Sequence, residues 1–155
     1  MRVEVLTDAD WRAWRDLRLE ALADTPIGFG ELHADAVLRS DEEWEERINH
    51  PPNPGVRVMA FDGDEAVGMA GGFVSDAGLP ILFAVYVRPA ARGGEVLRLL
   101  VDEVAAWAAP APLTLDVHVD NERARRAYLT LGFVLTGETT PGGGIDGRDL
   151  HRMRR

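Results

Sequence analysis

Three residues near the middle of the chain have the composition of a phosphate-binding turn. Arg92, Gly93 and Gly94 stand between an apolar run, residues 81–87, and a stretch whose apolar residues recur every three or four positions. The run predicts a buried strand, and the spacing predicts a helix. A helix that follows a glycine turn presents free backbone N–H groups and a positive dipole end to an anion. We therefore predict that these three residues lie under a pyrophosphate, while a plain glycine turn is the alternative.

The side chains give little support to thiolate chemistry or to metal binding. Cysteine is absent, which excludes disulfides and thiolate chemistry. Glu31, His33, Asp35 and His50 include no His-x-His pair and no helical i,i+4 pair with a third ligand. We predict no metal site.

Hydrophobic periodicity and turn residues define the elements around the turn. Predicted strands are residues 3–6, 56–61, 66–74, 81–87, 113–119, 133–138 and 149–153. One helix is predicted over residues 11–23, with Thr7, Asp8 or Asp10 as its cap, and a second opens at a capping box of Ser40 and Glu43. The central helix ends at Pro110, and the last helix starts at Asp120 or Asn121 and ends at Gly132.

The resulting order is β-α-α-β-β-β-α-β-α-β-β. It predicts a single α/β domain of the α+β type over residues 1–155, with a mixed, mostly antiparallel sheet and helices on both faces. The chain has 155 residues, 46% of them hydrophobic, which is the length and composition of a single domain. The net charge of −9 argues against nucleic acid as a partner. No apolar run has the length of a membrane span, so we expect a cytoplasmic protein with no membrane partner.

Two motifs and the element order resemble the GCN5-related N-acetyltransferases. Residues 121–133 (NERARRAYLTLGF) fit the family's N-x-x-A-x-x-x-Y-x-x-x-G-F run, with Asn121, Ala124 and Tyr128 in place. Residues 86–93 fit Y-V-R-P-x-x-R-G, the cofactor-binding strand and turn, and residues 24–31 (DTPIGFGE) resemble a segment near the acceptor site of small bacterial members. The resemblance covers essentially the whole chain.

The resemblance implies an acyltransferase that moves an acetyl group directly from acetyl-CoA to a primary amine of a small molecule or a peptide or protein N-terminus. The site would lie in a cleft where the strands 81–87 and 113–119 splay apart. Tyr128 would protonate the leaving CoA thiolate, as a general acid can, and the Val87 N–H would stabilise the oxyanion. The implied cofactor-binding residues are Val85 and Val87 through their backbone, the turn and helix start of Arg92, Gly93, Gly94, Glu95, Val96 and Leu97, and the helix residues Asn121 and Ala124.

The chain departs from the family in its turn. Counting from Arg92, Glu95 and Leu97 stand where the family's Arg/Gln-x-x-Gly-x-Gly/Ala turn has its two small residues. Either Gly93 and Gly94 serve in a shifted register, or Glu95 points to solvent, or cofactor binding is weak or lost. The last case would leave a degenerate relative that binds a ligand without transfer.

The sequence leaves two further questions open. Candidates for the general base are Asp116 and His118 on one face of a strand, Glu31 or His33 in the acceptor loop, and a water chain. His118 is also consistent with a histidine whose hydrogen bonds are satisfied inside the sheet. The acceptor's identity and a homodimer are not decided by any motif.

Overall fold

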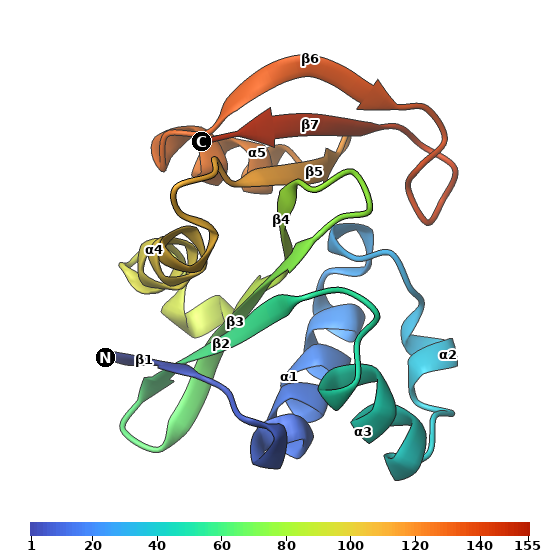
Figure 1. Cartoon of the computed structure of the whole chain (residues 1–155), viewed down its shortest axis with the longest axis vertical. Helices are drawn as coiled ribbons and strands as arrows, with labels where there is room; N and C mark the ends of the chain where they lie inside the picture. The colour runs from blue at the N-terminus through green and yellow to red at the C-terminus, as the bar shows by residue number, and fades with distance from the viewer.

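The computed structural model describes residues 1–155 and contains one seven-stranded sheet in the order β1-β2-β3-β4-β5-β7-β6 (Figure 1). The strands are β1 (Arg2–Val5), β2 (Gly55–Asp62), β3 (Glu65–Val74), β4 (Pro80–Val87), β5 (Thr114–His118), β6 (Val134–Thr140) and β7 (Leu150–Arg154). The helices are α1 (Trp11–Asp24), α2 (His33–Ala36), α3 (Asp41–Asn49), α4 (Val96–Ala108) and α5 (Glu122–Thr130), with short 3-10 turns η1 (Asp8–Asp10), η2 (Pro26–Gly28) and η3 (Pro89–Ala91). The predicted order and mixed sheet are confirmed, and α2 is an addition. No helix is long and apolar enough to span a membrane.

Local signals account for most of the element boundaries. The Ser40 hydroxyl accepts a hydrogen bond from the Glu43 N–H at 3.2 Å and begins α3, although the returning half of the predicted capping box is not formed. Asn121, rather than Asp120, caps α5 by accepting from the Ala124 N–H at 3.3 Å. The single turn of α2 has no cap bond and was not predicted, because four residues show no helical period.

The sheet separates two hydrophobic cores. Helices α4 and α5 pack on one face around Leu100, Val104 and Phe133, while α1 and α3 cover the other face around Trp14 and Met69 (Figure 1). The apolar stripe predicted for the central helix is the buried face of α4. These layers fix the position of β4 between the two cores. Residues from both faces of the sheet can therefore meet at the edge of β4 that faces β5.

The parallel strands β4 and β5 diverge almost as soon as they meet. Their only register pair is Ile81 with Thr114, and beyond it the strands separate. On its other edge β4 has a register shift against β3 between Met69 and Gly71. Ala84, opposite that shift, adopts a φ of 53°, which is rare for a residue with a side chain. The predicted splay between these two strands is therefore confirmed, and a bulge in β4 bends the strand at this point.

Candidate active site

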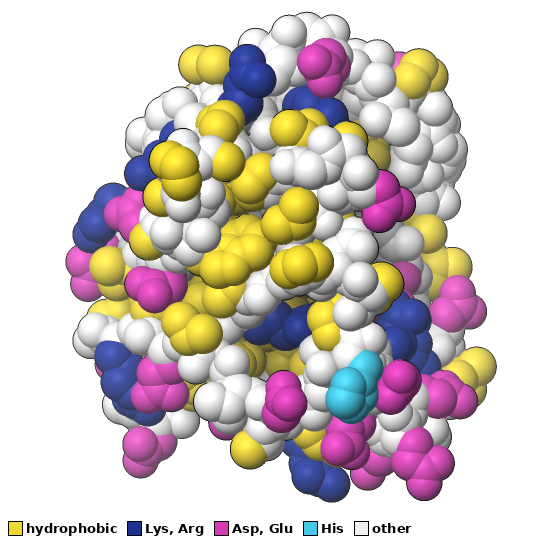
Figure 2. Space-filling model, viewed as in Figure 1, with side chains coloured by type: hydrophobic (Ala, Val, Ile, Leu, Met, Phe, Trp, Pro, Cys, Tyr) yellow, Lys and Arg dark blue, Asp and Glu magenta, His cyan; other side chains and the backbone are white.

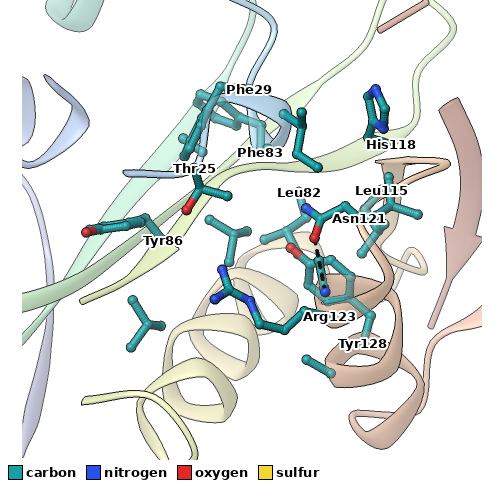
Figure 3. Close-up of a pocket in the computed structure, with 18 of the residues that line it drawn as sticks. Thr25, Phe29, Leu82, Phe83, Tyr86, Leu115, His118, Asn121, Arg123 and Tyr128 are labelled. Atoms are coloured by element: carbon teal, nitrogen blue, oxygen red, sulfur yellow. Dashed lines mark hydrogen bonds between the residues drawn. The ribbon is translucent and has the colours of Figure 1, made fainter. Parts of the chain in front are cut away.

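A cavity of about 350 Å³ occupies the splay between β4 and β5. Figure 2 shows hydrophobic side chains gathered in the hollow that crosses the middle of the molecule. Asn121 and Tyr128 of α5 lie on one side, and Thr25, Phe29 and Tyr86 lie on the other (Figure 3). The volume and the mostly apolar lining are those of a small-molecule site.

The start of α4 presents a row of unused hydrogen-bond donors. The backbone N–H groups of the six residues from Gly93 to Arg98 donate to no acceptor in the protein. Gly93 has a φ of 80°, a conformation that glycine adopts without strain, and it turns the chain into the helix. Gly93, Gly94 and Leu97 also line the cavity. Such a row at a helix N-terminus can bind a phosphate group.

The Arg92 side chain has a different position from the one expected under a pyrophosphate. Its Nε donates to the Val87 carbonyl at 2.8 Å, and its Nη2 donates to Asp24 at 2.6 Å. The hydrogen bond from Arg92, followed by one from Thr25, holds the pKa of Asp24 below its ordinary value. Arg92 therefore ties the turn to the end of α1, and the backbone supplies the donors.

Glu95 and Val96 contribute to this end through their backbone only. The Glu95 side chain is 57% exposed and pairs with Arg98 at 3.5 Å. Neither residue lines the cavity, and the Val96 side chain is buried in the core. Of the alternatives left open for the turn, the outward position of Glu95 is the one that the structure shows.

Backbone direction along β4 places two further N–H groups at the cavity. The Arg88 N–H donates to Val67 of the chain segment next to β4. Because N–H groups alternate in direction along a strand, those of Val87 and Val85 point away from β3 and into the splay. Both residues line the cavity. Since Arg92 uses the Val87 carbonyl, the N–H of Val87 is the group left for a ligand.

The third set of expected residues lies on α5. Asn121 and Ala124 line the cavity, and the Asn121 Oδ1 is engaged as the helix cap. Tyr128 is 9% exposed, packs edge-on against Phe133, and its hydroxyl has no partner in the protein. Burial raises the pKa of the Tyr128 phenol. Tyr128 is therefore a neutral hydrogen-bond donor at neutral pH.

Neither base candidate on β5 is a free base. Asp116 forms a two-point ion pair with Arg152 at 3.1 and 3.3 Å. The His118 Nδ1 accepts from the Asp120 N–H at 3.0 Å, so the proton of the neutral ring is on Nε2, which faces Asp146 at 2.9 Å. His118, Asp120 and Asp146 lie close enough to hold a metal ion. However, a histidine ligates through an unprotonated nitrogen, and the unprotonated nitrogen of His118, Nδ1, is already engaged by the Asp120 N–H.

The base candidates of the acceptor loop lie away from the cavity. Burial alone would raise the pKa of Glu31, but hydrogen bonds and charges of Arg39 and Arg18 outweigh it and lower that pKa. An ionised carboxylate held by two guanidinium groups is a poor proton acceptor. His33 is exposed on α2 and does not line the cavity.

The profile of the acetyltransferase (GNAT) family matches residues 8–133. The chain belongs to this family. No curated protein matches it.

Solved structures of GNAT proteins share the fold over nearly the whole chain. A GNAT acetyltransferase from Streptococcus pneumoniae is 18% identical, with 99% of this chain and 98% of that chain covered and a TM-score of 0.76. The ribosomal-protein-alanine N-acetyltransferase from Brucella melitensis is 24% identical, with 100% and 99% covered and a TM-score of 0.75. The acetyltransferase yncA from Salmonella typhimurium, solved with acetyl-CoA, is 19% identical, with 100% and 92% covered and a TM-score of 0.72.

Three side chains of this GNAT site were not named as site residues from the sequence, although Tyr86 begins the motif of residues 86–93. Phe83 and Tyr86 of β4 and Arg123 of α5 line the cavity (Figure 3). The Tyr86 hydroxyl donates to Glu20 at 3.1 Å, and burial, followed by this bond, raises the pKa of Tyr86 to about 12. Glu20 is 66 residues away in the chain, so no local spacing signals the pair. For Arg123, its place in the α5 motif was the available signal.

Proposed function

We propose that this GNAT protein transfers the acetyl group of acetyl-CoA directly to a primary amine of a small molecule or of a peptide or protein N-terminus. One observation carries the proposal: a single cavity joins the unused N–H row at the start of α4 to the helix that carries Tyr128. The row suits a diphosphate and the Tyr128 hydroxyl suits a sulfur leaving group. A CoA thioester has both.

Different residues stabilise different parts of the reaction. The Val87 N–H stabilises the negative charge that develops on the thioester oxygen as the amine nitrogen attacks the carbonyl carbon. Tyr128 donates a hydrogen bond to the sulfur while the C–S bond breaks and the C–N bond forms. A thiol with a pKa of about 8.5 is a stronger acid than this phenol, so complete proton transfer from Tyr128 is uphill. Tyr128 therefore acts mainly as a hydrogen-bond donor, and water completes the protonation.

The acceptor side favours an amine that carries no further positive charge. The carboxylate that lines the cavity, Asp116, is paired with Arg152, Arg92 is paired with Asp24, and Arg123 adds positive charge to the lining. A chimera of a Vibrio cholerae protein and hSSAT, whose fold matches with a TM-score of 0.71, is named as a spermidine N-acetyltransferase. A polyamine fits this chain less well than a monoamine, because no free carboxylate is present for its second charge. The amine's proton leaves through water, since Asp116 and His118 are both engaged.

Calorimetry with acetyl-CoA and with desulfo-CoA is the first test, followed by CoA release with benzylamine, an alanyl tripeptide and spermidine. We expect both ligands to bind and one of the first two amines to be acetylated. Binding of both ligands without CoA release from any amine would favour the degenerate relative. No binding at millimolar concentration would remove both functions.

A further inference from the structure

The loop between β6 and β7, residues 141–149, forms one wall of the cavity without a hydrophobic anchor. Gly143, Gly144 and Ile145 line the cavity. Every residue of the loop is exposed except Gly144, which is half-buried. A loop with so little buried apolar surface depends on polar contacts for its position.

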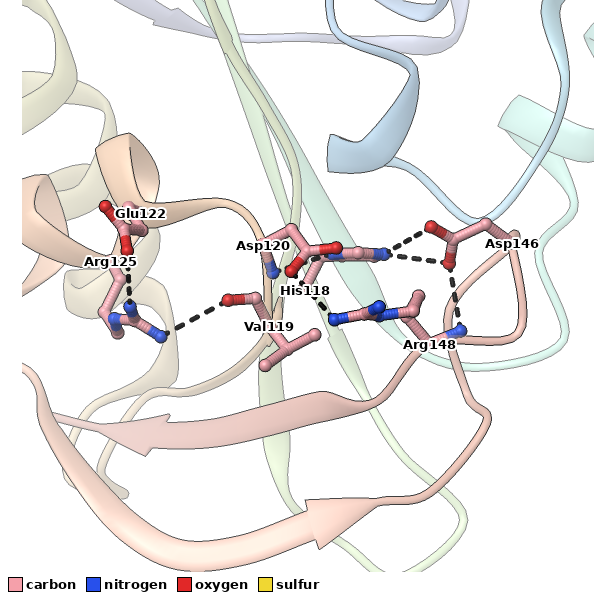
Figure 4. Close-up of polar contacts among 7 residues, drawn as sticks. All are labelled: His118, Val119, Asp120, Glu122, Arg125, Asp146 and Arg148. Carbon is pink, nitrogen blue, oxygen red and sulfur yellow. Dashed lines mark hydrogen bonds and ion pairs between the residues drawn. The ribbon is translucent and has the colours of Figure 1, made fainter.

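One of those contacts joins the loop to a buried group of the sheet. The His118 side chain is 1% exposed, and its Nε2 lies 2.9 and 3.0 Å from the two carboxylate oxygens of Asp146 (Figure 4). The Asp120 N–H fixes the ring by donating to Nδ1 at 3.0 Å. The Nε2–H of His118 is thereby aimed at the loop from a ring that cannot rotate without losing a bond.

The other contacts hold the loop less firmly. Arg148 pairs with Asp120 at 3.1 Å, but the two side chains are 59% and 50% exposed, and such pairs contribute little. Asp149 accepts from the Gly142 N–H at 3.0 Å, a contact within the loop itself. The ends of the loop are held by backbone bonds, from the Val119 N–H to the Asp149 carbonyl at 3.0 Å and from the Gly143 N–H to the Thr140 carbonyl at 3.1 Å. Between these ends, the His118–Asp146 pair is the contact that joins the loop to a buried side chain.

The loop also lies directly on the histidine ring. A methyl group added at Gly144 would stand 3.0 Å from the His118 Cδ2 and 2.9 Å from the Arg148 carbonyl oxygen. Real Cβ atoms do not approach backbone oxygen so closely, and the Asp146 Oδ1 also stands at 3.0 Å, so any side chain here must distort the loop where it meets the ring. The absence of a side chain at Gly144 and the hydrogen bond at Asp146 thus both keep the loop in its position against the His118 ring.

We propose that His118 and Asp146 form a latch that positions the loop 141–149 as a wall of the acceptor end of the cavity. His118 is then a positioning residue and not the general base. The effect on acceptor binding rests on the proposed acetyltransferase function, whereas the latch itself does not. The loop and helix α4 lie on opposite sides of β4 (Figure 1), so release of the loop should change acceptor binding and leave CoA binding intact.

Hydrogen exchange of the loop tests the latch without any acceptor. In Asp146→Ala we expect the amides of residues 141–149 to exchange at least about tenfold faster, because the variant loses the bond from the His118 Nε2 and the bond from the Arg148 N–H at 3.0 Å. Asp146→Asn keeps an oxygen that can accept from Nε2–H and should restore slow exchange. Asp64→Ala, in the exposed turn between β2 and β3, is the control and should match the wild type. Unchanged exchange in Asp146→Ala would overturn the proposal.

Gly144→Ala gives an independent route to the same state, because it displaces the loop with every hydrogen-bonding group present. Asp64→Ala again serves as the control, because the turn between β2 and β3 does not line the cavity. With whichever of benzylamine or the alanyl tripeptide is acetylated, both Asp146→Ala and Gly144→Ala should raise the acceptor KM about tenfold and leave the desulfo-CoA Kd unchanged. A matching loss of CoA affinity, or no change of acceptor KM with faster loop exchange, would contradict the placement at the acceptor end. If the wild type binds no CoA, the proposed function fails while the exchange experiment still decides the latch.

Discussion

In the proposed reaction, Tyr128 is the residue on which the chemistry depends most directly. We expect Tyr128→Phe to lower kcat by about 10²-fold, the lower end of the range for a positioned acid, because full proton transfer from this phenol is uphill. The ring and its contact with Phe133 remain, so Tm and the acetyl-CoA Kd should stay near the wild-type values. Since burial raises the pKa of the phenol, the wild-type rate should show no loss from its ionisation below pH 10. A full-rate, normally stable Phe variant would leave Tyr128 as a packing residue.

A substitution of Glu95 tests whether the unusual turn weakens the binding of acetyl-CoA. Its carboxylate is exposed and pairs with Arg98 outside the cavity. We expect Glu95→Gln to change the acetyl-CoA Kd by less than about threefold, because water and salt screen an outward charge. Calorimetry at 20 and 200 mM salt measures this. An affinity gain of tenfold or more in the variant would mean that the carboxylate reaches the diphosphate.

The motif residues of this site could be read from the sequence, while their partners could not. Asn121, Tyr128 and the glycine turn each lie in a local pattern, and the structure brings all of them to one cavity. The partner of Arg92 is Asp24, 68 residues away, and that of His118 is Asp146, 28 residues away. Such pairs depend on how the sheet brings distant segments together, and no spacing along the chain encodes them.

At the scale of elements, the site exists because β4 bends. Ala84 has a φ of 53° beside the register shift, and a residue with a side chain in this region costs about 1–2 kcal/mol. The strand itself was predictable from its apolar run. Its bulge was not, because alanine carries no signal for a left-handed conformation and β4 contains no glycine.

Substitutions at Ala84 should show how much the bend of β4 contributes to stability and to ligand binding. Ala84→Val adds a β-branched side chain at a positive φ, and we expect a loss of roughly 2 kcal/mol, or about 4–8 °C in Tm, together with weaker binding of desulfo-CoA. Ala84→Gly relieves the strain at a cost in chain entropy of similar size, so its stability should stay within about 1 kcal/mol of the wild type. Thermal unfolding and calorimetry report the two effects. Equal behaviour of the two variants would show that the bend is not set by Ala84.

The whole molecule consists of two parts of one sheet that share little backbone pairing. Strands β1 to β4 form one part and β5 to β7 the other, and Ile81 with Thr114 is the register pair between them. Packing of Leu82 and Leu113 in one core holds the parts together on the α4 side. A ligand in the splay contacts both parts, the turn before α4 on one and α5 on the other. Ligand binding should therefore stabilise the fold as a unit.

Acetyl-CoA should raise the melting temperature of the whole chain in a single transition. At a ligand concentration one hundred times its Kd, the folded state gains about 2.7 kcal/mol, which corresponds to roughly 5–10 °C for a chain of this size. Desulfo-CoA should give a shift of similar size, because in the proposed complex the free N–H row from Gly93 to Arg98 faces the diphosphate that the two ligands share. Adenosine, which has no diphosphate, is the control and should shift Tm by less than about 1 °C at the same concentration. Equal shifts with adenosine and acetyl-CoA would show that the N–H row does not carry the binding, and two separate transitions would show that the parts unfold independently.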